Sequence, residues 1–162
     1  MNYYDNFYEG LNDNRNLLYR QIDTVSSMNK LLSTICSELH NLKNYKINLK
    51  GDNSLILKEF LSTIIEKFEE YDDKIQELIK IKNGFPIYQL TDIDNISLIK
   101  TQVSQDYKPS VAITNIVKEF KTIKNLIIET LTIAQKENDY KTIITLSDLL
   151  YEVNKVLLNY EL

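Results

Sequence analysis

The sequence has few residues that break helices or form cross-links. Its 162 residues include three glycines, two prolines, one cysteine and no tryptophan. A shortage of Gly and Pro favours long helices over an architecture of strands and turns. The single cysteine, Cys36, excludes an internal disulfide framework and is typical of a reducing compartment. We therefore expect an all-α, cytoplasmic protein.

Long apolar segments and runs of basic residues are also absent. The apolar runs are much shorter than a membrane span, and no secretory pattern opens the sequence, so we expect no membrane partner. The 19 basic residues are outnumbered by 23 acidic ones, and the formal net charge is −4. Because neither end of the chain is basic, direct DNA binding is disfavoured.

What the sequence does contain is apolar residues spaced three and four positions apart, the pattern of amphipathic helices. It predicts long helices over about residues 14–50 and 54–82, a third that starts at Pro109, and a fourth after a break at Asn138–Asp139. A short helix over residues 92–101, capped by Thr91, is expected between the second and third. Residues 1–13 are expected to form a tail and residues 14–162 a single domain.

Two short stretches predict how the second helix is bounded. Gly51 suits the left-handed residue that closes the first helix, and Asp52, Asn53 and Ser54 offer oxygens that could cap the second. A turn over residues 83–86 ends it.

Loop lengths predict the topology. Short turns join the first helix to the second and the third to the fourth, so each pair is antiparallel. The connection over residues 87–108 is long enough to run the length of a bundle. A four-helix bundle with one long crossover, here carrying a short fifth helix, is the ferritin-like arrangement.

One polar residue interrupts the apolar stripe of the first helix. The position after Leu42 on that stripe is Lys46, where an apolar residue is expected. A lysine that faces a core or an interface needs a carboxylate partner or a shifted pKa.

Several motifs in residues 46–86 resemble the Dps family of mini-ferritins, and the likeness extends over about residues 30–160. The matching features are Lys50–Gly51, Leu57–Lys58–Glu59, Phe68, the Asp73–Glu77 pair and the turn Gly84–Phe85–Pro86. The resemblance implies a shell of subunits, a dodecamer in this family, with an iron-oxidising site between two subunits. It also implies a role in iron storage and protection against oxidative stress.

The sequence departs from the family at that site. By the resemblance, Lys46 and Lys58 stand where the family has histidines, and Ser62 stands in place of an aspartate. Asp73 and Glu77 are the ligands that remain. A protonated lysine offers a metal no lone pair and brings a positive charge.

These replacements lead to a hypothesis and two alternatives. We expect Lys46 and Lys58 to pair with Asp73 and Glu77 of a neighbouring subunit, with no cofactor at this position and no conventional ferroxidase activity. One alternative is an active ferroxidase in which Asp73 and Glu77 still bind iron at a rearranged carboxylate site. Another is an unrelated helical bundle that acts as an interaction module.

Two further features are less informative. Glu137 and Asp139 lie where the family's shells have acidic pores, but lysines interleave with them, so they are only possible pore residues. His40 is the one histidine and follows Cys36 by a helical turn. No other metal ligand or nucleophile clusters with them, so we expect this pair to be structural.

Overall fold

The computed structural model describes residues 15–160, with side chains from residue 24 onwards. Its helices are α2 (Arg15–Asn48), α3 (Ser54–Ile81), α4 (Leu90–Ile96), α5 (Pro109–Lys136) and α6 (Tyr140–Tyr160). These agree with the four long helices and the one short helix predicted from the sequence. The predicted tail lies outside the described residues.

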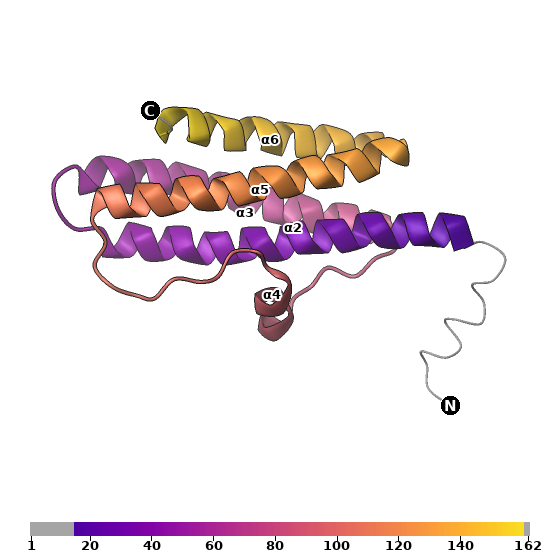
Figure 1. Ribbon diagram of the computed structural model, residues 1–162, viewed down its shortest axis with the longest axis horizontal. Helices are drawn as coiled ribbons and strands as arrows, with labels where there is room; N and C mark the ends of the chain where they lie inside the picture. The colour runs from indigo at the N-terminus through magenta and orange to yellow at the C-terminus, as the bar shows by residue number, and fades with distance from the viewer. Residues whose placement is uncertain (1–14, 161–162) are drawn as a thin grey trace.

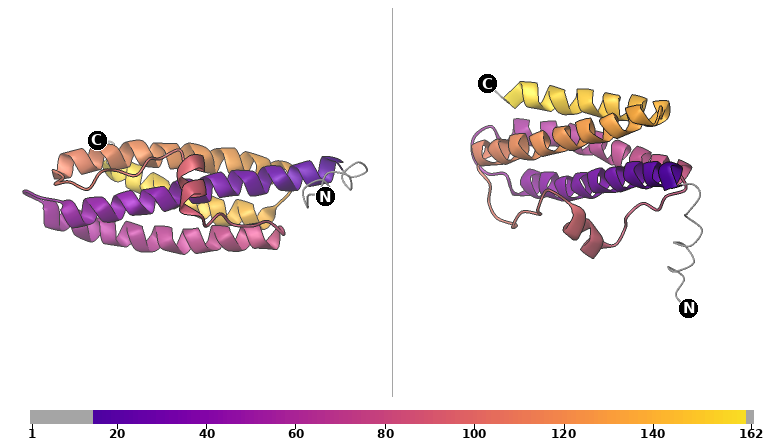
Figure 2. Two further views of the ribbon diagram at one scale, coloured as in Figure 1. Left: turned by 90° about the horizontal axis from the view of Figure 1, so that it is seen from below. Right: turned by 45° about the vertical axis from the view of Figure 1, so that its right-hand side comes forward.

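The four long helices form a bundle of two antiparallel pairs, α2 with α3 and α5 with α6 (Figure 1). Helix α2 also packs on α5, and α6 packs more lightly on α3. The connection from α3 to α5 runs along the outer side of α2, and α4 lies on this side, away from α6 (Figure 2). The predicted four-helix bundle with one long crossover is thus confirmed. None of the described helices is long and apolar enough to cross a membrane.

The predicted apolar stripes form the core. Leu57, Leu61, Ile64 and Phe68 of α3 are buried, and the Phe68 ring lies 5.0 Å from that of Phe120 on α5. Lys46, the misfit on the first stripe, is only half-buried because it lies near the end of α2.

Residues in the left-handed conformation bound the long helices. Gly51 has φ +106° after α2, and Asn83 and Asn138 have φ 58° and 57° after α3 and α5. Asn tolerates this conformation better than other residues with a Cβ. The capping prediction for α3 was wrong: Asn53 precedes the helix at φ 65° and makes no side-chain capping hydrogen bond.

The short helix α4 begins and ends earlier than predicted. Its first turn closes on Gln89, whose carbonyl accepts hydrogen bonds from the N–H groups of Asp92 and Ile93, so Gln89 and not Thr91 is the cap. It ends at Ile96 because Ser97 is extended and bonds its Oγ to the backbone of Ile99.

Asparagine side chains of α2 hold the crossover against the bundle. Asn29 Nδ2 donates to the Phe85 carbonyl at 3.0 Å, and its Oδ1 accepts from the Ile87 N–H at 3.1 Å. In the same way Asn41 binds the Lys100 carbonyl at 3.1 Å and the Gln102 N–H at 2.7 Å. These amides satisfy backbone groups of a segment that has little secondary structure of its own.

Candidate functional site

The five residues singled out by the sequence lie at two separate places. Lys46 lies near the end of α2, close to the start of α3, where Lys58 and Ser62 lie in the first three turns. All three are half-buried. Asp73 and Glu77 lie in the second half of α3, and both are exposed.

The lysines and the acids cannot meet within one chain. Asp73 follows Lys58 by fifteen positions in one continuous helix, which corresponds to about 22 Å along its axis. Within the described residues, neither Lys46 nor Lys58 makes an ion pair, and the Ser62 hydroxyl donates to the Lys58 carbonyl at 2.9 Å. A cluster of these groups therefore requires a second copy of the chain.

The two acids open onto a groove between the end of α3 and the start of the crossover. It is lined by Asp73, Gln76, Glu77, Lys80, Ile81, Pro86 and Tyr88. The Tyr88 hydroxyl donates to Gln76, whose amide donates to Asp72 at 2.6 Å. Within the described residues, these polar neighbours therefore form hydrogen bonds among themselves and not with Asp73 or Glu77. Burial raises the pKa of Asp72, but Asp73 and Glu77 point to solvent.

Apolar side chains surround the lysine end. Ile47 is 76% exposed, and Leu55 and Ile56 are each 69% exposed. Ile47 follows Lys46 directly, and Leu55 precedes Lys58 by one helical turn. Exposed apolar residues gathered beside half-buried lysines are typical of a surface that another protein covers.

The possible pore residues have a partner within the chain. Lys82, just after α3, lies with its Nζ 3.3 Å from Glu137 Oε2 and 2.9 Å from Asp139 Oδ2. These side chains are only 10–17% exposed. Burial alone would lower the pKa of Lys82, but the hydrogen bonds and charges of Asp139 and Glu137 outweigh it and raise that pKa. The pore role of both acids stays a prediction.

Cys36 and His40 show no reactive arrangement. The His40 ring Nδ1 lies 2.8 Å from the Cys36 carbonyl, not from the thiol. Burial, with the negative charge of Asp72, raises the pKa of the thiol, which makes the thiolate scarcer. Among the described residues no group of three or more His, Cys, Asp or Glu could hold a metal ion.

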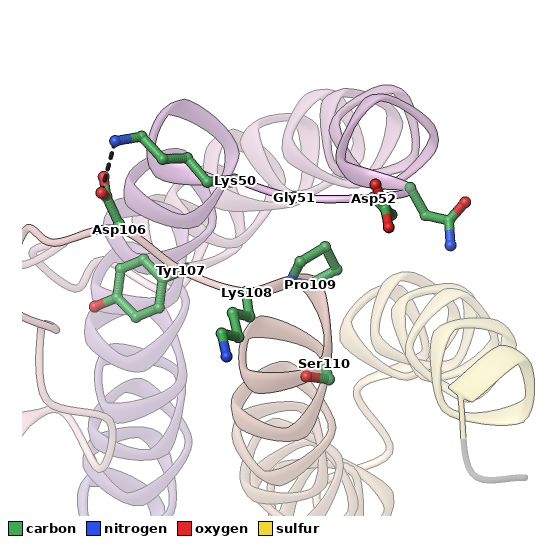
Figure 3. A pocket seen from close by; sticks show the side chains of 9 residues that line it. Lys50, Gly51, Asp52, Asp106, Tyr107, Lys108, Pro109 and Ser110 are labelled. Carbon is green, nitrogen blue, oxygen red and sulfur yellow. Dashed lines mark hydrogen bonds and ion pairs between the residues drawn. The ribbon is translucent and has the colours of Figure 1, made fainter.

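Another pocket lies at the end of the bundle where α3 and α5 begin (Figure 3). Lys50 turns to Asp106, with its Nζ 2.6 Å from Oδ2, and Pro109 faces the Gly51–Asp52 segment. Two backbone hydrogen bonds join the crossover to the end of α2: the Lys50 N–H donates to the Tyr107 carbonyl, and the Tyr107 N–H donates to the Asn48 carbonyl, each at 2.9 Å. These contacts fix the end of the crossover.

Four buried polar residues between α2 and α5 were missed by the sequence analysis. Glu38, Asn41 and Tyr45 come from α2 and Glu119 from α5. The spacing does indicate that Glu38 is buried, because it falls three residues after Ile35 on the apolar stripe of α2. The neighbouring Leu39 is also buried and fits the same apolar spacing, so the spacing alone does not single out Glu38.

A protein-family model described as ferritin-like domain matches residues 25–161. The chain belongs to the ferritin-like family. The match includes all of the lysine, serine and carboxylate positions above, and it agrees with the family expected from the sequence.

Comparison with solved structures shows the fold of the Dps proteins. Dps from Staphylococcus aureus is 19% identical, with a TM-score of 0.81 over 86% of this chain and 93% of that one. Dps from Vibrio cholerae is 17% identical, with a TM-score of 0.84 over 88% and 89%. Dps from Bacillus brevis is 17% identical, with a TM-score of 0.84 over 88% and 95%. A search of curated proteins gave no match.

The interior of this ferritin-like bundle does not fit a di-iron centre. Such centres take a Glu from each of two helices and a Glu-x-x-His motif from each of the other two. Here α2 and α5 supply Glu38 and Glu119, but the buried residues of α3 and α6 include no carboxylate and no histidine. The donors from half of the bundle are missing.

Proposed function

We propose that the chain assembles with copies of itself into a Dps-like hollow shell, by resemblance a dodecamer, that lacks a conventional ferroxidase centre. The observation that carries this proposal is the separation of Lys46 and Lys58 from Asp73 and Glu77. Among the residues that the structure describes, neither pair has a partner of opposite charge in its own chain, although the two pairs are complementary.

Contact between two copies would bring these groups together. Two ammonium groups beside two carboxylates form a cluster with no net charge, which needs no metal ion. The exposed Ile47, Leu55 and Ile56 would lose their contact with water at the same contact, at a gain of about 25 cal/mol per Å² of apolar surface. Charged pairs then select the register of the contact, and apolar burial supplies most of the affinity.

The same cluster would exclude iron chemistry of the usual kind. Ferrous iron binds carboxylate and imidazole ligands, and Lys46 and Lys58 supply neither. Their positive charges would also repel a dication from the two acids that remain. The shell would then store or protect without oxidising iron at the contact between subunits.

Two measurements test this function. Light scattering on the purified protein should give a mass near twelve chains, and a mass of one or two chains would contradict the shell. Oxygen consumption after addition of ferrous iron should not exceed that of a buffer control. Faster consumption that Asp73→Ala abolishes would instead support a rearranged ferroxidase site.

A further inference from the structure

Two glutamates lie in the interior of the bundle where α2 packs on α5, and their carboxyl groups interact. Glu38 on α2 is fully buried, and Glu119 on α5 is 7% exposed. No Lys, Arg or His of the described chain makes an ion pair with either of them. Two carboxylates side by side without a cation are strongly unfavourable away from water.

The surroundings of the two carboxyl groups differ. Tyr45 donates its hydroxyl to both oxygens of Glu119, at 3.1 and 3.2 Å, and Asn41 Nδ2 donates to Glu119 Oε1 at 3.1 Å. Neither oxygen of Glu38 has a donor of this kind. Donated hydrogen bonds stabilise a carboxylate, so any negative charge belongs on Glu119.

We propose that Glu38 keeps its proton at neutral pH and donates a hydrogen bond to Glu119, so that the pair carries one negative charge and needs no metal ion. A proton on Glu38 lets one of its two buried oxygens donate a hydrogen bond. It also gives Glu119 a third donor. The pair thus carries a single charge that three donors stabilise on Glu119, without any cation, in a bundle whose α3 and α6 cannot complete a di-iron centre.

The groups that face the pair favour this state. Burial, with the charge of Glu119 added to it, raises the pKa of Glu38 well above its usual range, and burial also raises the pKa of Glu119. Lys100 and Lys118 line a pocket that reaches Glu119 from outside, but Lys100 pairs with Asp94 at 3.4 Å and Lys118 is exposed. The buried residues of α3 offer only Tyr71 as a titratable group, and those of α6 offer none.

Through Asn41, the protonation state of the pair is coupled to the contact between the crossover and α2. Asn41 binds Glu119 and also the backbone of Lys100 and Gln102, so the proton-sharing pair and the crossover share one side chain. A folded-state pKa above the ordinary Glu value, about 4.3, means that stability falls as the pH rises from there towards the folded-state pKa. Ionisation of Glu38 would place a second charge beside Glu119.

Infrared spectroscopy of the folded protein tests the proposal directly. At pH 7 the wild type should show the carbonyl band of a protonated carboxylic acid, and this band should disappear on unfolding at the same pH. Glu38→Gln should remove the band, and Glu129→Gln, which changes an exposed glutamate on α5, should leave it. Absence of the band in the folded wild type would overturn the proposal, even if the variants do not fold.

A second measurement separates the proton from a metal. Calorimetry with Mn²⁺ and with Fe²⁺ under argon should give no binding that depends on Glu38. Binding with release of a proton in the wild type, lost in Glu38→Gln and kept in Glu129→Gln, would show that the pair is a cation site instead.

Discussion

Lys82 Nζ lies 2.9 Å from Asp139 Oδ2, which joins the end of α3 to the turn between α5 and α6. Asp139 also accepts hydrogen bonds from the backbone N–H of Thr142 at 3.2 Å and from its hydroxyl at 2.5 Å. One carboxylate thus caps α6 and neutralises a largely buried lysine.

Replacing Lys82 by Met should strongly destabilise the fold. Glu137 and Asp139 would be left as two largely buried acids without a cation, at a cost on the order of 3 kcal/mol. Urea unfolding followed by circular dichroism measures the loss. Lys80→Met is the matched control: Lys80 is exposed and lies 4.5 Å from the Phe85 ring centroid, a contact worth about 1 kcal/mol or less. Equal losses in the two variants would contradict the role of Lys82.

The same contact predicts that the stability of the fold depends on pH in the acid range. Burial alone would raise the pKa of Asp139, but the hydrogen bonds from Thr142 and Lys82 outweigh it and lower that pKa. The carboxylate therefore stabilises the fold fully above about pH 4, the ordinary Asp value. This contribution is lost as the pH falls through the lower folded-state pKa. In Asp139→Asn, unfolding free energy should depend less on pH between about 5 and 2 than in the wild type.

Gly84 should tolerate no side chain, for a reason of space and not of backbone conformation. A Cβ at this position would lie 2.7 Å from Cγ1 of Val25 on α2. Gly84→Ala should therefore cost about 1–3 kcal/mol through overpacking. Adding Val25→Ala should make room and recover part of that loss. If the double variant is less stable than the sum of the two single changes predicts, the proposed clash is wrong.

Restoring the family's ligands should create an iron site. The triple variant Lys46→His, Lys58→His, Ser62→Asp places imidazole and carboxylate groups where lysines and a serine now lie. If copies meet as proposed, it should bind ferrous iron and consume oxygen faster than the wild type. Adding Asp73→Ala to the triple variant should abolish the gain. No gain in a triple variant that still assembles would mean that the positions are misassigned.

Nucleic acid should bind poorly, because the net charge of −4 is repeated in every subunit of an assembly. A gel-shift experiment with duplex DNA at low salt should show no retardation at micromolar protein. Retardation that modest salt removes would instead indicate non-specific electrostatic binding to DNA.

The sequence predicted the helices well, because apolar spacing reports directly on which face of a helix is buried. Ile64 and Phe68 lie in the core as their spacing required. The ends were less predictable, since Gln89 closes the first turn of α4 with its backbone carbonyl, which any residue could supply.

The polar partners could not be predicted from spacing alone. Glu137 and Asp139 were recognised as a pair of acids, but Lys82, more than fifty residues earlier, meets them only in the folded chain. Glu38 and Glu119 share the stripes of buried apolar residues, and only the packing of α2 on α5 brings them together. For Lys46 the sequence indicated a missing partner, and the structure places none within the described chain.

Charge reversal combined with mass measurement is the most direct test of the contact between copies. Lys58→Glu should lower the mass in solution, because the new carboxylate would face Asp73 and Glu77 of another copy. Adding Asp73→Lys to the same chain should restore the mass, and Lys118→Glu, a reversal at an exposed lysine of α5, should leave it unchanged. A Lys58→Glu protein that keeps the wild-type mass, or a double variant that stays dissociated, would contradict the account.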